Sequence, residues 1–236
     1  MKKPGSGAAA VILTVLIFGV CLAVPALMLH ARTEQVEEEP APTEALSLAE
    51  RVELYGRYDS GELARRNLDE SEIDNDTLMS AVRRANALET SLVADQGAQR
   101  SLSSTGTNFY TVSDGTGSIR IMEYYREWVG DWSNWFWVKL NIDTLEVFYC
   151  YYSAACERNI SDYDSYDFYN ASAMIMDFAS AIGYDGYDSE SVTDGVPFDV
   201  ELLNSATGES LTYECRMHTY SDAASLLVDR EYTLKG

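Results

Sequence analysis

The sequence predicts an α+β protein in which an N-terminal transmembrane helix precedes an extracytoplasmic domain of amphipathic helices packed on antiparallel sheet. Three observations predict this class. The chain begins with one long apolar stretch, two later segments carry apolar residues at helical spacing, and segments of alternating apolar and polar residues follow each of them. Because the order of helix and then strands occurs twice, at about 76–152 and 168–234, the domain is expected to contain two α-then-β halves.

The apolar stretch at residues 8–31 predicts a membrane anchor. From Ala8 to Leu29 the chain has no charged side chain, and a helix of this length extends roughly 33 Å. That length is enough to cross the hydrocarbon core of a bilayer. A helix also satisfies its own backbone hydrogen bonds, so its insertion into the membrane is favourable.

The charges beside this segment predict its orientation. Lys2 and Lys3 precede it, whereas Arg32 is the only basic residue that follows closely. Because cytoplasmic flanks carry the excess of lysine and arginine, residues 1–7 are expected to be a short cytoplasmic tail. The cell membrane is therefore the expected location, with a single pass and the C-terminal domain outside the cytoplasm.

A cleavable signal peptide is the competing interpretation of the same segment. The small residues around Val24-Pro25-Ala26 offer a cleavage site, and cleavage would make the protein secreted. The apolar run is longer than the usual signal core, which favours the anchor. Both interpretations place the domain outside the cytoplasm.

Acidic residues dominate the rest of the chain. Residues 32–45 form an acidic, proline-containing linker that is expected to hold the domain at residues 46–236 away from the membrane. The whole chain has 17 Lys and Arg against 38 Asp and Glu, a net charge of −21. Such a charge repels phosphate backbones and excludes nucleic acid as a partner. Apart from the membrane, the expected partner is another membrane or envelope protein.

Capping and periodicity predict the helices. Ser47 and Glu50 form a capping box that begins a short helix at about 48–56, and a second short helical stretch is expected at about 59–67. The helix from Asp76 buries one apolar face, and a fourth helix follows Asp167 and ends at Gly183, which suits a left-handed C-cap. The apolar positions of these two helices are Leu78, Val82, Ala85, Leu88 and Leu92, and Phe168, Ala171, Ile175, Phe178 and Ile182.

Alternation and turn residues predict the strands. They are expected at 109–112, 119–125, 134–142, 145–152, 196–202, 211–217 and about 226–233. A two-residue turn at Asp143-Thr144 would pair residue 137 with residue 150. One face of that hairpin would then carry Trp135, Trp137, Lys139, Phe148, Cys150 and Tyr152, and the other would carry Phe136, Val138, Leu140, Ile142, Leu145, Val147, Tyr149 and Tyr151.

The first of these faces supplies the candidate ligand-binding residues Trp135, Trp137, Lys139 and Tyr152. Flat aromatic rings stack on sugar rings or clamp peptides, and a lysine among them can hold a carboxylate. The alternative is that the N-terminal helices cover this face as a second core. The four tryptophans of the chain, which include Trp128 and Trp132, lie close together in this part of the sequence.

No catalytic constellation is found, so an enzyme and a cofactor are not expected. After the apolar stretch the chain has one histidine, His218, three residues from Cys215. An odd separation on a strand puts two side chains on opposite faces, which makes this pair a poor dyad. No metal site is expected either. The weak calcium candidates are Asp162, Asp164 and Asp167, whose spacing does not match an EF-hand loop.

Three cysteines follow the apolar stretch, and their pairing is open. Cys150 with Cys156, or Cys156 with Cys215, could form a disulfide in an oxidising envelope. The alternative is that they are buried thiols that pack as small apolar groups.

These patterns predict location better than activity. The leading hypothesis is a non-enzymatic accessory or sensor protein of a bacterial-type cell envelope that acts through a membrane or envelope partner. The alternative is a module that binds cell-wall glycan or peptide with the aromatic sheet face, and an envelope hydrolase is a third, weaker hypothesis.

Overall fold

The structure, a computed structural model, describes residues 46–93, 101–129, 134–157, 163–189, 193, 195–221 and 225–235, without the side chains of residues 134, 154–170 and 219–227. The predicted tail, anchor and linker all fall outside these ranges. Within the described residues, no helix is both long and apolar enough to cross a membrane.

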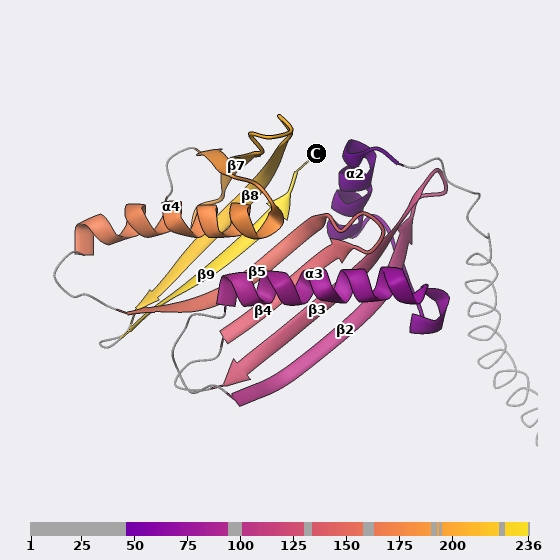
Figure 1. The fold of residues 1–236 in the computed structure, drawn as a ribbon, viewed down its shortest axis with the longest axis horizontal. Helices are drawn as coiled ribbons and strands as arrows, with labels where there is room; N and C mark the ends of the chain where they lie inside the picture. The colour runs from indigo at the N-terminus through magenta and orange to yellow at the C-terminus, as the bar shows by residue number, and fades with distance from the viewer. Residues whose placement is uncertain are drawn as a thin grey trace, which may run out of the picture. The chain divides into compact units, whose positions relative to one another are not determined.

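One antiparallel sheet of nine strands dominates the fold (Figure 1), in the order β1-β2-β3-β4-β5-β9-β8-β7-β6. Its strands are β1 Arg65–Asn67, β2 Ser101–Ser113, β3 Ser118–Val129, β4 Asn134–Asn141, β5 Val147–Glu157, β6 Gly186–Ser189, β7 Phe198–Leu203, β8 Ser210–Ser221 and β9 Ser225–Leu234. The predicted α+β class is therefore wrong, because the molecule is mainly sheet. Local patterns predicted two α-then-β halves, whereas the pairing of β5 with β9, far apart in sequence, joins the strands of both halves into one sheet.

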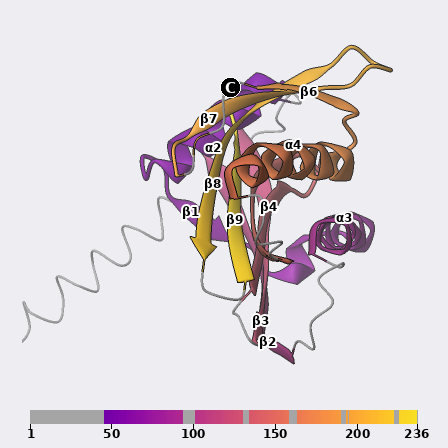
Figure 2. The ribbon, with the colours of Figure 1, turned by 90° about the vertical axis from the view of Figure 1, so that its left-hand side faces the viewer.

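Three α-helices are present in the described part of the chain: α2 Leu48–Asp59, α3 Asn75–Val93 and α4 Tyr163–Ile182, with a 3-10 turn at Glu70–Glu72. Helices α3 and α4 lie on the same side of the sheet (Figure 2). Arg84 of α3 donates hydrogen bonds of 3.1 Å to the carbonyls of Ala181 and Ile182, the last residues of α4. Its charge thus offsets the negative end of the α4 dipole.

Several predicted helix boundaries are confirmed and others are wrong. The capping box of Ser47 and Glu50 is present, and Gly183 has the left-handed φ of 98° expected of a C-cap. The stretch predicted as helical at 59–67 instead ends in strand β1. Helix α4 begins at Tyr163, earlier than the start after Asp167 that the sequence predicted.

The core lies between the sheet and the helices α3 and α4. Phe178 of α4 stacks on Tyr232 of β9 with 3.9 Å between ring centroids, and Tyr152 of β5 stacks on the same ring at 6.2 Å. Phe136 of β4 is completely buried and meets Tyr124 of β3 edge to face. These stacked rings define the helix-covered face of the sheet.

The register of the β4–β5 hairpin differs from the prediction. The turn is longer than two residues, and Leu145 in it takes a left-handed φ of 62°. Leu140 still pairs with Val147, as predicted, but the register shifts by one at an irregularity between Lys139 and Leu140. Val138 therefore pairs with Cys150, one position from the predicted partner. A slip of one residue turns every side chain of a strand to the other face. This moves Tyr149, Tyr151 and Tyr152 between faces, as described below.

Helix α2 packs on the opposite side of the sheet from α3 and α4. The ring of Tyr55 stacks on Phe148 at 4.8 Å, and Arg57 forms an ion pair with Asp114 at 2.6 Å. Tyr58 lies against Tyr110 of β2. Helix α2 therefore covers one end of this second face and leaves the remainder, the open face, without a helix in the described part of the chain.

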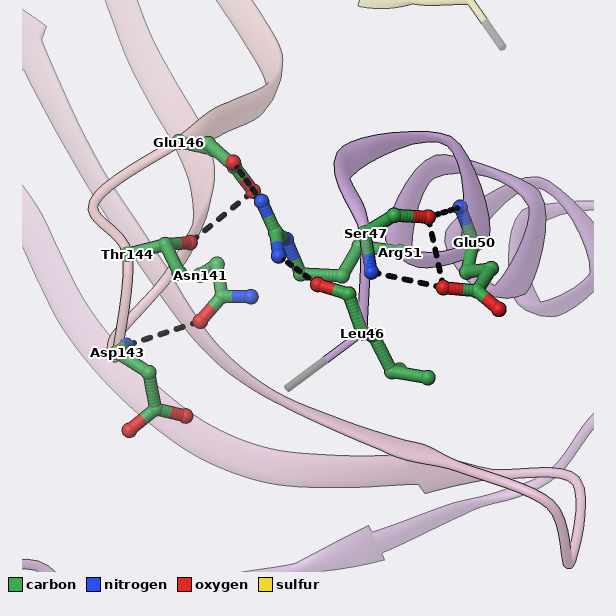
Figure 3. A network of polar contacts seen from close by, with 8 residues as sticks. All are labelled: Leu46, Ser47, Glu50, Arg51, Asn141, Asp143, Thr144 and Glu146. Atoms are coloured by element: carbon green, nitrogen blue, oxygen red, sulfur yellow. Dashed lines mark hydrogen bonds and ion pairs between the residues drawn. The ribbon is translucent and has the colours of Figure 1, made fainter. Parts of the chain in front are cut away.

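A polar network fixes the start of α2 to the β4–β5 turn (Figure 3). Arg51 donates two hydrogen bonds to the carboxylate of Glu146, one of them of 2.7 Å from Nε, and a third to the carbonyl of Leu46. Thr144 donates to Glu146 as well, at 3.0 Å. Since this ion pair is mostly shielded from solvent, it holds α2 against the sheet more firmly than an exposed pair would.

Candidate functional site

An open groove lies on the open face and is lined mostly by aromatic rings. Its volume is about 530 Å³, within the range of small-molecule sites. We call it the aromatic groove. Its lining residues are Asn108, Glu123, Tyr125, Trp135, Trp137, Tyr149 and Tyr151.

Strand alternation and register bring these residues together. Side chains two residues apart on one strand share a face, and directly paired residues of neighbouring strands lie side by side. Tyr125 of β3, Trp137 of β4 and Tyr151 of β5 form one cross-strand row. Trp135 is paired with Glu127 in the next row. The groove therefore runs across the strands, from β2 to β5.

Trp137 is held in a fixed orientation at the centre of the groove. Its indole N–H donates to Glu123 Oε1 at 3.1 Å, and its ring meets Tyr149 edge to face at 5.6 Å. Glu123 also accepts from Asn108 at 3.4 Å and lies 3.6 Å from the guanidinium of Arg65. Despite these contacts Trp137 remains 36% exposed. A large apolar ring is thus both oriented and accessible.

Trp135 presents a second accessible ring, 39% exposed. Its backbone N–H donates to the hydroxyl of the buried Ser153 at 3.0 Å, which ties β4 to β5 at this position. Two exposed tryptophans on one face of one strand are unusual, because large apolar side chains normally gain free energy from burial.

Tyr125 depends on a glycine for its position. A Cβ atom added to Gly106 of β2 would lie 2.3 Å from Cε1 of Tyr125, so the tyrosine ring occupies the space of the missing side chain. Gly106 and Tyr125 are direct partners across the two strands. The glycine therefore lets the ring lie over β2 at this end of the groove.

Charged groups beside the groove are compensated by one another. Glu123 faces Arg65, Glu231 lies 3.7 Å from Arg216, and Lys139 lies 3.4 Å from Asp59. Burial, with the charge and hydrogen bond of Glu231, raises the pKa of Tyr149 far above neutrality, so its phenol stays protonated. Apart from the ion-paired carboxylate of Glu123, the lining of the groove consists of aromatic side chains and the neutral amide of Asn108.

Two of the four predicted binding residues line the groove and two do not. Lys139 shares the open face but lies at the end of α2, with its side chain only 12% exposed and ion-paired to Asp59. Its ammonium lies 5.3 Å from the Trp137 ring centroid, so it supports that ring. Tyr152 is buried on the helix-covered face, because the true register turns it away from Trp135 and Trp137.

Sequence reasoning missed Tyr125, Tyr149 and Tyr151. The latter two were assigned to the core face, and the correct hairpin register would have placed them beside the tryptophans. The other tryptophans do not join the groove. Trp128 shares the face of Tyr124 and packs against the core, while Trp132 falls outside the described residues.

The cysteine, histidine and aspartate candidates are separate from the groove. Cys150 and Cys215 are buried free thiols, and burial raises the pKa of both. Neither predicted disulfide is present, since each requires one of these two, and the side chain of Cys156 is not described. His218 is paired with Asp229 on the open face, away from Cys215, as the odd separation predicted.

Metal binding finds no support in the described side chains. No group of three or more His, Cys, Asp or Glu in that part of the chain could hold a metal ion. The weak calcium candidates Asp162, Asp164 and Asp167 have side chains outside the described residues, so the expectation about them stays a prediction.

Comparisons of the chain with protein family models, with curated proteins and with solved structures found no match.

Proposed function

We propose that this protein is a non-enzymatic binding module that holds an uncharged segment of a cell-wall glycan in the aromatic groove. The observation that carries the proposal is the pair of accessible, oriented rings of Trp135 and Trp137 on one strand. A sugar ring has flat faces of C–H groups and a rim of hydroxyls. Aromatic rings pack on the C–H faces, and phenol and amide groups form hydrogen bonds with the hydroxyls.

The electrostatics favour a glycan over a charged peptide. A charged ligand binds most strongly to an unpaired group of opposite charge, but Glu123, Lys139 and Glu231 beside the groove already have partners of opposite charge. The amide of Asn108 and the phenols of Tyr125 and Tyr151 supply polar contacts without net charge. The chain's net charge of −21 also disfavours anionic polymers.

Retention on purified peptidoglycan sacculi tests this proposal. Replacing Trp135 or Trp137 with alanine is expected to weaken binding by about 2 kcal/mol, roughly 30-fold in Kd, as for other central aromatic contacts. Trp128→Ala serves as the matched control, because that ring packs on the other face of the sheet. Undiminished retention of the Trp135 and Trp137 variants would refute the proposal.

A second arm separates glycan from peptide. Uncharged oligomers of N-acetylglucosamine, which carry no stem peptide, should bind as tightly as peptide-bearing wall fragments. If only fragments that carry stem peptides bind, the groove recognises peptide, and the glycan assignment is wrong.

The accessory or sensor role stays a prediction, because the segment that suggested it, residues 8–31, lies outside the described residues. It is compatible with a binding module, since an anchored domain that detects wall material would report through a membrane partner. Copurification of such a partner with the full-length chain from detergent extracts would support that role.

A further inference from the structure

Polar side chains continue the row of Trp135 beyond the aromatic groove. Asp229 of β9 is the direct partner of Ser153 of β5, and His218 of β8 is the direct partner of Asp229. Ser153 in turn accepts the hydrogen bond from the backbone of Trp135. Directly paired residues of neighbouring strands share a face, so Asp229 and His218 lie on the open face with the two tryptophans.

The row of Trp137 continues in the same way. Its partner Tyr151 is paired with Glu231 of β9, which is paired with Arg216 of β8. Neighbouring strands lie about 4.8 Å apart, so these two strands lengthen the surface by roughly 10 Å beyond β5. We call the side chains that continue the two rows the polar extension, which consists of Asp229, Glu231, Arg216 and His218.

Two tyrosines of the aromatic groove join it to the polar extension. The phenol of Tyr151 donates a hydrogen bond to the carboxylate of Asp229, and the phenol of Tyr149 donates one to Glu231. Both tyrosine rings line the groove. The two regions are therefore one surface, along which aromatic rings are followed by hydrogen-bonding groups.

The groups of the polar extension can meet a ligand. Arg216 and Glu231 lie 3.7 Å apart, with 45% and 35% of their side chains exposed. This ion pair is longer than a hydrogen bond, so it offsets the two charges while their donors and acceptors stay accessible. Partial burial raises the pKa of Asp229, although the hydrogen bond from Tyr151 and the charge of His218 oppose the rise. A carboxylate with less water around it accepts stronger hydrogen bonds.

A glycine positions His218 at the far end of the polar extension. A Cβ atom added to Gly195 would lie 2.9 Å from Cε1 of the imidazole, and Gly195 has a left-handed φ of 71°. The imidazole therefore lies over backbone, as the ring of Tyr125 lies over Gly106 at the other end of the open face. Since His218 is also exposed, its ring is both oriented and accessible, like that of Trp137.

We propose that the polar extension is a second subsite, which binds the hydroxyl groups of the next sugar of a glycan held in the aromatic groove. This inference rests on the proposed function. Carboxylates accept hydrogen bonds from sugar hydroxyls, and guanidinium and imidazole groups donate hydrogen bonds to them. Asp229 is paired with His218 and Glu231 with Arg216, so acidic and basic groups lie side by side and the subsite suits an uncharged ligand.

The dependence of affinity on chain length tests the second subsite. Calorimetric titration of the full-length protein in mild detergent compares the disaccharide and the hexasaccharide of N-acetylglucosamine. The hexasaccharide should bind roughly tenfold more tightly, because only the longer chain reaches the charged hydrogen-bonding groups on β9 and β8. Equal affinities that still depend on Trp137 overturn the second subsite and leave the proposed function standing. If neither oligomer binds, the proposed function is wrong, and the second subsite with it.

Substitutions assign the gain in affinity to particular residues. His218→Ala and Asp229→Asn should each lower the affinity for the hexasaccharide about fivefold and leave that for the disaccharide unchanged. Asparagine still accepts a hydrogen bond from Tyr151, so the position of that ring is kept. The matched control is Asp188→Asn, which makes the same change of charge on β6, the last strand of the sheet, and should alter neither affinity. A preference for the hexasaccharide that survives both substitutions contradicts the proposal.

The imidazole resonances of His218 provide an independent measurement, and the His218→Gln variant assigns them. They should shift during titration with the hexasaccharide and stay unchanged with the disaccharide. Equal shifts with the two oligomers, or no shift with the hexasaccharide, contradict the placement of the next sugar at the polar extension.

Discussion

The two faces of the sheet use the same kinds of residue for opposite purposes. On the helix-covered face, Tyr152 and Phe178 are buried in a stack with Tyr232. On the open face, Trp135 and Trp137 remain more than a third exposed. Tyr152 and the two tryptophans come from neighbouring positions on β4 and β5, so strand alternation separates a core from a surface. The difference lies in which face the helices α3 and α4 cover.

The comparison teaches that exposed aromatic residues carry more functional information than buried ones. Burial of Phe136 is explained by the free energy it gives to folding. Exposure of Trp137 is not explained in this way, because an accessible ring adds little to the free energy of folding. A hydrogen bond to Glu123 holds its indole ring in a fixed orientation, and an accessible ring held in this way suits a binding surface.

The largest expected effect is on the helix-covered face. Phe136→Ala should lower the free energy of unfolding by about 3–5 kcal/mol, since it opens a cavity under completely buried neighbours. Chemical denaturation measures this loss. Phe136→Leu, which retains most of the volume, should lose far less, and Trp135→Ala on the open face should cost the least of the three. A similar loss of stability in Phe136→Ala and Trp135→Ala would contradict the distinction between the two faces.

The next effect concerns the end of the second face that α2 covers, beside the open face. Arg51→Ala removes the hydrogen bonds to Glu146 and Leu46, and should cost about 1.5–3 kcal/mol because a partly buried charge loses its partner. Hydrogen exchange should accelerate in α2 while α3 keeps its protection. The matched control is Arg66→Ala, whose ion pair with Glu72 is exposed and is worth about 1 kcal/mol or less. Unchanged exchange in α2 would show that other contacts hold it.

A smaller effect is expected where Tyr125 lies over a glycine. Gly106→Ala forces the ring of Tyr125 to move, so retention on peptidoglycan should fall several-fold with a loss of stability of about 1 kcal/mol. Gly56→Ala in α2 meets nothing within 4 Å and should stabilise the helix by about 0.5–1 kcal/mol. If Gly106→Ala leaves retention unchanged, the position of Tyr125 does not matter for binding.

The smallest effect is a change in acid stability. Hydrogen bonds from Thr116, with those from Arg57 and Gly117, hold the pKa of Asp114 well below its ordinary value near 3.8. A lowered pKa in the folded state contributes stability above the unfolded pKa, and this contribution is lost as the pH falls below about 4. Asp114→Asn should therefore be less stable than the unmodified protein at pH 7, and the difference should shrink as the pH falls from 4 toward 2. A constant difference across that range would contradict the assignment.

Local signals in the sequence were sufficient for the elements that local chemistry determines. The capping box at Ser47 and the C-cap at Gly183 depend on a few neighbouring residues, and both are present. The sheet as a whole was not predictable in this way, because the pairing of β5 with β9 joins segments far apart in the sequence. The fold class was wrong for that reason.

Some of the residues that line the groove could be predicted from the sequence. Trp135 and Trp137 follow from alternation along β4 alone. The positions of Tyr149 and Tyr151 depend on the register shift between Lys139 and Leu140, an irregularity that the alternation of residues along the strands does not indicate. No pattern in the sequence indicates that α2 stops short of the tryptophans and leaves them accessible.

The most direct test of this account uses the indole N–H resonances of the protein during titration with soluble, uncharged oligomers of N-acetylglucosamine. The resonances of Trp135 and Trp137 should shift together with increasing glycan, and that of Trp128, on the helix-covered face, should not. Binding that leaves the Trp135 and Trp137 resonances unchanged, or that shifts Trp128 instead, would contradict the assignment of the open face as the binding surface.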